Sequence, residues 1–314
     1  MGEGKNTIQA GFVRYWDEKM KIAVTAAILI LIFFKIDVKM IAYYIDAADI
    51  SYILISYLIA FFGIILQIAR WRVLFIGRAN GFIRCHFIGM FYQLFTPAAG
   101  QDIIRGYFLS KKHGSIAYSS SFTGRIIGMS AIILFIHISI IFEMAHEING
   151  LISNLLYIFS IFLFLLIYLV LSKKITSKLR KHISFLDGNR FYNILLEIRN
   201  SMYNYRKYKI KILIAFIISI LIIFTAGAPQ YFIIKSLGYN IPFGAVIFYC
   251  PIIFIITIFP ISLNGLGIRE YLYFLFFNDY GIDFNAVISI SFFIYLFQIV
   301  CGAIGYCFLI VRKK

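Results

Sequence analysis

Long apolar runs constrain the fold of this chain more than any other feature. About 20 apolar residues in an α-helix are enough to cross the ~30 Å hydrocarbon core of a bilayer. With 61% hydrophobic and only 14% charged residues, the 314-residue chain is too apolar for an ordinary soluble domain. We therefore predict an all-α polytopic membrane protein. Its full spans are expected at about 20–35, 50–69, 115–142, 151–171, 210–234 and 286–311.

Two further apolar stretches, about 84–112 and 243–277, are interrupted in the middle by proline and glycine. Each arm of roughly 13–17 residues reaches only ~20–25 Å, short of the ~30 Å core. We therefore predict two re-entrant hairpins, each entering and leaving by the same side. Broken backbone at that depth needs cover from protein or from a water-filled cavity. The alternative, two short spans in each stretch, would place Arg105, Lys111 and Lys112 outside.

The charges of the loops orient this layout. Lysine and arginine gather at 70–84, 111–112, 172–211 and 312–314. The opposite loops carry the acidic residues Asp37, Asp46, Asp49, Glu143, Glu147, Asp279 and Asp283. Because basic loops stay in the cytoplasm, we predict a multi-pass protein of the plasma membrane with both termini cytoplasmic.

The order of spans and hairpins repeats along the chain. The halves, about 1–145 and 146–314, each hold three full spans and one hairpin, and the two hairpins open to opposite sides. We therefore predict a single integral membrane domain, 1–314, built as an inverted-topology repeat, which is the plan of many secondary transporters.

The net charge of +16 follows from these basic loops and does not indicate nucleic-acid binding. We expect anionic lipid headgroups as partners and no nucleic acid. The five histidines are scattered and the four cysteines lie in apolar segments, so no metal site is predicted. Phosphate-binding-loop, dinucleotide-binding and nucleophile motifs do not occur in the sequence, so we predict no cofactor and no enzyme activity.

The first break runs from Pro97 to Arg105. Pro97 removes a backbone donor and Gly100 permits a tight turn, so the arms end near mid-membrane. The second arm then begins with Gln101 and Asp102, and free N–H groups at a helix start favour an anion such as phosphate. Arg105 either pairs with Asp102 at i,i+3 or binds phosphate in a bidentate way. Intramembrane charges mark functional sites, so these residues are candidate substrate ligands, although a pair that only locks the hairpin is the alternative.

The second break carries a similar set of candidates: Pro260, Asn264, Gly265, Gly267, Arg269 and Glu270. Adjacent helical residues point about 100° apart, so we expect that Arg269 and Glu270 do not face each other and that one pairs with the first hairpin. Either Glu270 or Asp102 is a candidate proton carrier if transport is coupled. Charged, helix-breaking interruptions at corresponding positions of two halves are the best sequence pointer to a transporter's substrate site.

Arg125 is a further candidate, between Gly124 and Gly128 near the start of the span 115–142. The spacing of these glycines lets another helix approach closely. Arg125 either faces a cavity or snorkels to the cytoplasmic surface, and its place near the inner end favours snorkelling. Gln230 and Gln298, inside later spans, are expected mainly to bond between helices.

The two breaks resemble the signatures of a known family. Residues 96–107, followed by Lys111, Lys112 and 125–128, are similar to the first signature of the flippase-like family named after the lysylphosphatidylglycerol synthase transmembrane region. Residues 260–270 are similar to its second signature. The family includes the flippase part of the bacterial multiple peptide resistance factor, which moves aminoacylated phosphatidylglycerol to the outer leaflet. Here Ala98 and Ala99 stand where the family often has glycine. The 314 residues include no soluble synthase domain, so we do not expect the chain itself to aminoacylate a lipid.

The resemblance and the two breaks predict a lipid flippase that moves an anionic or phosphate-bearing headgroup, phospho- or prenyl-linked, between leaflets. Arg105 and Arg269 would receive the phosphate, and Asp102 and Glu270 would balance them. One alternative is an integral-membrane glycosyltransferase, or its accessory subunit, acting on a lipid-linked substrate. An ion-coupled transporter of small solutes is another. As partners we expect the membrane lipid substrate and enzymes of envelope-lipid biosynthesis.

Overall fold

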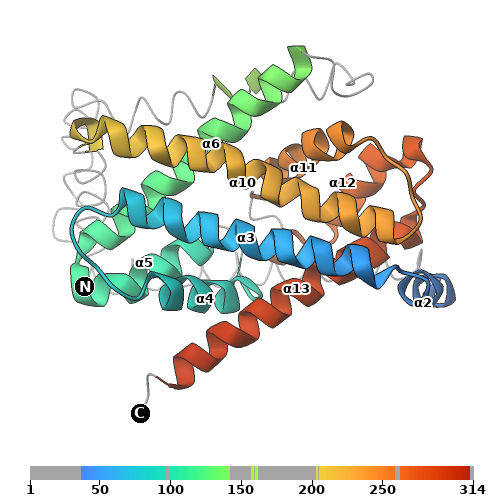
Figure 1. The fold of residues 1–314 in the computed structure, drawn as a ribbon, viewed down its shortest axis with the longest axis horizontal. Helices are drawn as coiled ribbons and strands as arrows, with labels where there is room; N and C mark the ends of the chain where they lie inside the picture. The colour runs from blue at the N-terminus through green and yellow to red at the C-terminus, as the bar shows by residue number, and fades with distance from the viewer. Residues whose placement is uncertain are drawn as a thin grey trace, which may run out of the picture.

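The computed structural model describes residues 37–96, 100–141, 157–158, 160–161, 203, 205–258 and 262–311, and within these ranges the regular structure is helical throughout. The elements are α2 (Val38–Asp46), α3 (Ile50–Leu74), α4 (Phe82–Gln93), α5 (Gly100–His113), α6 (Ser115–Ile141), η2 (Tyr205–Lys207), α10 (Lys209–Ser236), α11 (Phe243–Ile258), η3 (Leu263–Gly265), α12 (Ile268–Phe277), η4 (Asn278–Tyr280) and α13 (Phe284–Ile310) (Figure 1).

Four of these helices, α3, α6, α10 and α13, are long and apolar enough to cross a membrane. They confirm the spans predicted at 50–69, 115–142, 210–234 and 286–311, and the all-α polytopic fold. The other two predicted spans, 20–35 and 151–171, lie outside the described residues, apart from 157–158 and 160–161, which are helical.

The two proline- and glycine-broken stretches form two pairs of short helices. Helices α4 and α5 have 12 and 14 residues, and α11 and α12 have 16 and 10, all below the ~20 needed to span. Along the long axis of the molecule, α4 and α5 lie toward one end and α11 and α12 toward the other (Figure 1). Pro97 and Pro260 themselves lie outside the described residues.

Helices α3 and α10 form an antiparallel pair along the whole long axis (Figure 1). At one end the Asp49 N–H donates to the Ser236 carbonyl oxygen at 3.0 Å, and at the other the Tyr205 hydroxyl donates to the Leu74 carbonyl oxygen at 2.5 Å. Between them, Gly63 lets the helices approach, because a Cβ there would lie 2.9 Å from the Thr225 hydroxyl oxygen.

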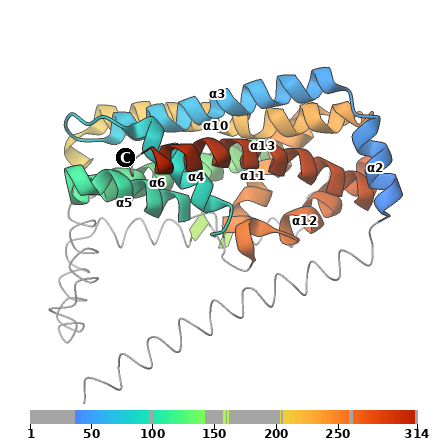
Figure 2. The same cartoon turned by 90° about the horizontal axis from the view of Figure 1, so that it is seen from below.

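Helix α4 packs antiparallel on the C-terminal half of α13 (Figure 2). Gly302 and Gly305 provide the room: a Cβ on Gly305 would lie 2.0 Å from the Phe87 carbonyl oxygen. Arg84 then donates to the Phe308 carbonyl oxygen at 2.7 Å. Small residues thus permit the same close helix contact that they give transmembrane helices in general.

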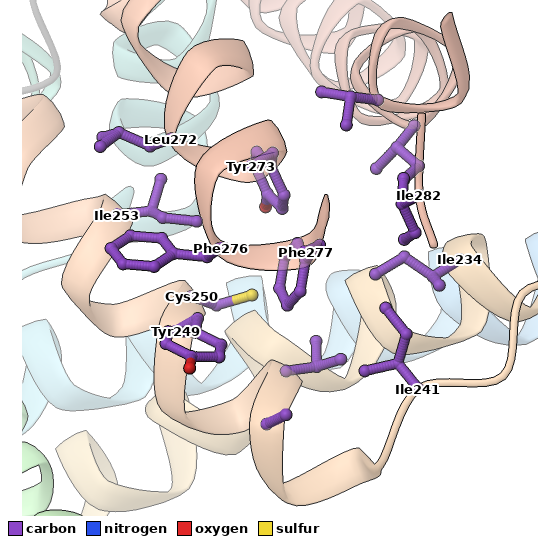
Figure 3. Close-up of a cluster of buried hydrophobic side chains, with 14 of the residues drawn as sticks. Ile234, Ile241, Tyr249, Cys250, Ile253, Leu272, Tyr273, Phe276, Phe277 and Ile282 are labelled. Carbon is purple, nitrogen blue, oxygen red and sulfur yellow. The ribbon is translucent and has the colours of Figure 1, made fainter. Parts of the chain in front are cut away.

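Helices α11 and α12 enclose the largest apolar core of the described chain (Figure 3). Tyr249 stacks on Phe276 with ring centroids 4.8 Å apart, and Phe277 is fully buried beside them. Ile234 from α10 and Ile282 from the segment before α13 pack on the same cluster. In the second break itself, the described residues Ser262, Asn264, Gly265 and Gly267 are buried by protein, as broken backbone at membrane depth requires.

Several contacts between elements occur in the pairs that an inverted repeat predicts, although the contact of α6 with α10 has no α13–α3 counterpart of similar size. Helix α4 packs on α13 as α11 packs on α6, α5 contacts α6 as α12 contacts α13, and α3 contacts α10. The inverted repeat, its halves 1–145 and 146–314 and the single domain 1–314 nevertheless stay predictions, because each half includes a span outside the described residues.

A polar cluster ties three elements together at the end of the molecule opposite to the C-terminus. Tyr44 of α2 donates to the Asp283 carboxylate, and the Tyr44 and Tyr239 hydroxyl oxygens are 2.8 Å apart. Burial alone would raise the pKa of Asp283, but hydrogen bonds from Tyr44, backbone N–H groups and Tyr239 outweigh burial and hold that pKa below its usual value. Asp283 also caps α13 by accepting from the Ala286 N–H at 2.9 Å.

Gly305→Ala should destabilise the protein by about 1–3 kcal/mol, because the added methyl group has no room beside the Phe87 carbonyl and α4 must shift away from α13. Thermal unfolding in detergent measures the effect. The matched control is Gly124→Ala, whose Cβ would meet side chains and no backbone: the end of Leu74 at 3.3 Å and Nε of Arg70 at 3.9 Å. Equal losses of stability in the two variants would contradict the close α4–α13 contact.

Candidate functional site

A cavity of about 330 Å³ lies among α3, α6 and α10, and α4, α5, α11 and α13 also contribute residues to its lining. Its charged lining residues are Arg70, Asp102, Arg105 and Arg125. Five glutamines share the lining: Gln67, Gln93, Gln101, Gln230 and Gln298. A polar cavity inside a bundle of membrane helices is costly unless it serves a ligand or a path.

Asp102 joins two of the arginines. Its Oδ1 atom lies 2.5 Å from Nη2 of Arg105, and its Oδ2 atom lies 3.0 Å from Nη1 of Arg125. The i,i+3 pair was one of the two alternatives that the sequence left open for Arg105, and the structure contains it. Helix α5 begins at Gly100, where a Cβ would clash with the Thr96 hydroxyl oxygen. Asp102 then falls in the first turn of α5, where the helix dipole stabilises a carboxylate.

Arg105 is the most tightly held of the three arginines, with a side chain only 3% exposed. Its Nε donates to the Ser121 hydroxyl at 2.7 Å, and its guanidinium lies 4.9 Å from the Trp71 ring centroid. Nη1 lies 3.4 Å from Nδ1 of His86. With these partners and Asp102, Arg105 is suited to fix the carboxylate in place.

Arg125 faces the cavity, so the preference for snorkelling was wrong. It lies ten residues after the start of α6, which is ~15 Å along the helix and too deep for the side chain to prefer the surface over Asp102. Its guanidinium also lies 5.6 Å from the Phe254 ring centroid. Its Nη2 atom is buried and has no hydrogen-bond acceptor among the described residues. A guanidinium N–H in that position is ready to donate to a ligand.

Arg70 was not predicted from the sequence as a site residue. The apolar run ends at residue 69, so Arg70 was assigned to the basic loop that follows it. Helix α3 in fact continues to Leu74, so Arg70 lies inside the helix and lines the cavity. Its Nη1 donates to the Ser219 hydroxyl at 3.0 Å, and a Cβ on Gly128 would lie 2.6 Å from that nitrogen. The i,i+3 spacing of Gln67 and Arg70 was the available signal for a polar helix face.

The second break makes a different structure. Asn264, Gly265 and Gly267 adopt positive φ angles of 49°, 75° and 82°, the left-handed region that asparagine and glycine tolerate best. The Asn264 amide donates to Oε1 of Gln298 at 3.1 Å, so the turn contacts a cavity residue. The predicted interhelical role of Gln298 is confirmed, and the same side chain lines the cavity.

Arg269 and Glu270 lie 3.4 Å apart, contrary to the expectation that they do not face each other. Glu270 turns back to accept the Gly267 N–H at 2.5 Å, and the long Arg269 side chain reaches it while lying 4.2 Å from the Tyr295 ring centroid. This arrangement caps the first turn of α12. Neither residue lines the cavity.

Comparison with known protein families matches residues 20–305 to the family described as the lysylphosphatidylglycerol synthase TM region. The chain belongs to this family. The match confirms the resemblance predicted from the two breaks, and together with the apolar helices it makes the chain a multi-pass membrane protein. Membership indicates a role in lipid metabolism or translocation. No curated protein and no solved structure matches the chain.

In this member of the family, the predicted site residues separate into three groups. Gln101, Asp102, Arg105 and Arg125 line the cavity. Gly100, Asn264, Gly265, Gly267, Arg269 and Glu270 shape or cap the two breaks. Pro97 and Pro260 are outside the described residues. Within the described ranges, histidine, cysteine, aspartate and glutamate do not gather in threes as a metal site would need.

Asp102→Asn should destabilise this protein by about 3–5 kcal/mol, because two buried guanidinium groups lose their counter-ion. Adding Arg125→Gln to that variant should restore part of the stability, since one uncompensated charge is removed. Thermal unfolding in detergent checks both. Asp46→Asn, on an exposed side chain at the end of α2, is the control. The outcome against this coupling is additivity. It would be seen if Arg125→Gln lowered the stability of the Asp102→Asn protein by as much as it lowers the stability of the wild type.

Proposed function

We propose that this protein is a lipid flippase or translocase that moves a lipid with an anionic, phosphate-bearing headgroup between the two leaflets. The observation that carries the proposal is the charge of the cavity. Three arginines, Arg70, Arg105 and Arg125, face one carboxylate, Asp102, which leaves a formal charge of +2. An excess of buried cations at membrane depth is strongly unfavourable by itself, so an anionic ligand is the natural counter-charge.

We propose that the three arginines have different roles. Arg105 is saturated by Asp102, Ser121 and Trp71 and holds the carboxylate. Arg125 keeps one buried N–H group without an acceptor. Planar guanidinium groups match phosphate oxygens in a bidentate way, which favours Arg125 as the first phosphate ligand. Arg70, which donates to a single hydroxyl, that of Ser219, is the second.

These assignments revise the ligand set predicted from the sequence. Arg269 and Glu270 satisfy each other at the start of α12, outside the cavity lining, so we propose a structural role for them. The polar headgroup would enter the cavity while its acyl or prenyl tails stay in the bilayer. We place the protein in the plasma membrane with both termini cytoplasmic, and enzymes of envelope-lipid biosynthesis remain its proposed partners.

A glycosyltransferase role is less well supported. That chemistry needs paired carboxylates free to work at the membrane surface. Three of the described loop carboxylates, Asp37, Asp49 and Asp283, accept backbone N–H groups as helix N-caps. The carboxylate in the cavity, Asp102, has both oxygens in ion pairs. Transport without covalent chemistry therefore fits the site better.

Arg125→Gln should reduce the movement of an anionic phospholipid at least tenfold, because the loss of one charge-assisted contact to phosphate removes about 1.5–3 kcal/mol. Proteoliposomes with fluorescent phosphatidylglycerol, quenched from outside by dithionite, report the rate. Arg72→Gln is the matched control, since Arg72 lies two residues after Arg70 on the same helix but is exposed.

The two variants decide the proposal together. Normal movement in Arg72→Gln and loss in Arg125→Gln would support it. Wild-type rates in a folded, correctly inserted Arg125→Gln protein would overturn the site assignment. If the wild-type protein moved no lipid and no lipid raised its thermal stability, the proposed flippase function would be wrong.

A further inference from the structure

We infer that the lipid recognised by this cavity carries an uncharged, hydroxyl-bearing group beyond its phosphate, such as a polyol or a sugar. This inference rests on the proposed flippase function and narrows its substrate class. It excludes a headgroup that ends in an ammonium group, and it also excludes a bare phosphate. The polar residues of the cavity and their partners carry the argument.

The charges of the cavity gather in one region. Asp102 contacts both Arg105 and Arg125. The Arg70 guanidinium packs against Gly128 of α6, in the space that a Cβ would occupy. From Arg70, the lining face of α3 continues to Ser56, fourteen residues and ~21 Å along the helix. Beyond the arginines the polar groups of the lining are uncharged. A phosphate bound at the arginines would leave the rest of the headgroup in the remaining part of the cavity, where uncharged polar groups are set among apolar side chains.

Two glutamines of that part of the cavity have side chains without a protein partner among the described residues. Gln67 lies one turn before Arg70 on α3, and Gln93 lies at the end of α4, and both line the cavity. A third, Gln298, uses its oxygen to accept from Asn264, and its N–H groups find no acceptor within the described part of the chain. A carboxamide both donates and accepts hydrogen bonds, which is the match for a hydroxyl group.

A cationic headgroup does not fit the same part of the cavity. An ammonium group needs a carboxylate or several acceptors, and it can donate only. The carboxylate that lines the cavity is Asp102, and both of its oxygens are held by arginines. An added cation would meet a cavity that already has a formal charge of +2. A bare phosphate offers mainly acceptor oxygens, so it would satisfy the arginines without supplying the donors that the carboxamide oxygens of Gln67 and Gln93 can accept from.

The test compares four acyl- or prenyl-labelled fluorescent lipids in proteoliposomes. Phosphatidylglycerol carries phosphate and a polyol, a prenyl-phosphate hexose carries phosphate and a sugar, phosphatidic acid carries phosphate alone, and lysylphosphatidylglycerol ends in ammonium groups. At least one of the first two should move about tenfold faster than either of the others. If phosphatidylglycerol moves faster than the prenyl-phosphate hexose, the substrate is a glycerolipid. If the prenyl-phosphate hexose moves faster, the substrate is a prenyl lipid.

Gln67→Leu and Gln93→Leu test the residues. Each keeps a side chain of similar size but removes the amide, so movement of the hydroxyl-bearing lipid should fall roughly fivefold while phosphatidic acid is unaffected. Gln67→Asn keeps an amide and should retain more activity than Gln67→Leu. The matched control is Asn80→Leu, which removes an exposed amide outside the cavity.

A second readout separates this inference from the proposed function. Each lipid is added to the detergent-solubilised protein, and the gain in thermal stability reports binding without a driving gradient. If lipids bind and move but the hydroxyl-bearing ones have no advantage, or the leucine variants behave as wild type, the headgroup inference is wrong and the flippase stands. If no lipid stabilises the protein or moves, the proposed function itself fails.

Discussion

The bridge that Asp102 makes between Arg105 and Arg125 is the interaction on which the rest of the structure depends. It joins the second arm of the first broken stretch, α5, to the full span α6, using a carboxylate only 9% exposed. A guanidinium in a low-dielectric setting is tolerated only when it is paired and hydrogen-bonded. The bridge therefore allows two arginines to stay at membrane depth, and it positions Arg125 so that one N–H group is left for a ligand.

Both broken stretches reach the middle of α13. Leu94, after α4, lies against Gly302, and Asn264, in the turn before α12, donates to Gln298. These two positions on α13 are about one turn apart. The first break lines the cavity through Gln101, Asp102 and Arg105, whereas the second reaches it through the contact of Asn264 with the lining residue Gln298. Helices α3 and α10 also contribute lining residues.

The sequence predicted the elements better than it predicted the directions of the side chains. Span positions follow from apolar length, and the Asp102–Arg105 pair follows from helical spacing, so both were predictable. The place of Arg70 in the cavity was not predictable. An arginine at the end of an apolar run gives the same sequence pattern whether the helix ends before it or continues past it. Arg125 pointed inward because Asp102, 23 residues earlier in the chain, was within reach. Such tertiary contacts leave no periodic signal.

The two stretches contribute unequally to the cavity, and this asymmetry bears on its chemistry. The first supplies Asp102 and Arg105 to the lining, whereas the corresponding charges of the second, Arg269 and Glu270, neutralise each other away from it. Helices α11 and α12 instead form an apolar core (Figure 3). The predicted repeat therefore describes the plan of the chain but not the distribution of its charges. A cavity charged at one region and neutral beyond it can orient a headgroup, with the phosphate at the arginines and the uncharged part toward the glutamines. Equal charges in both halves would give no such orientation.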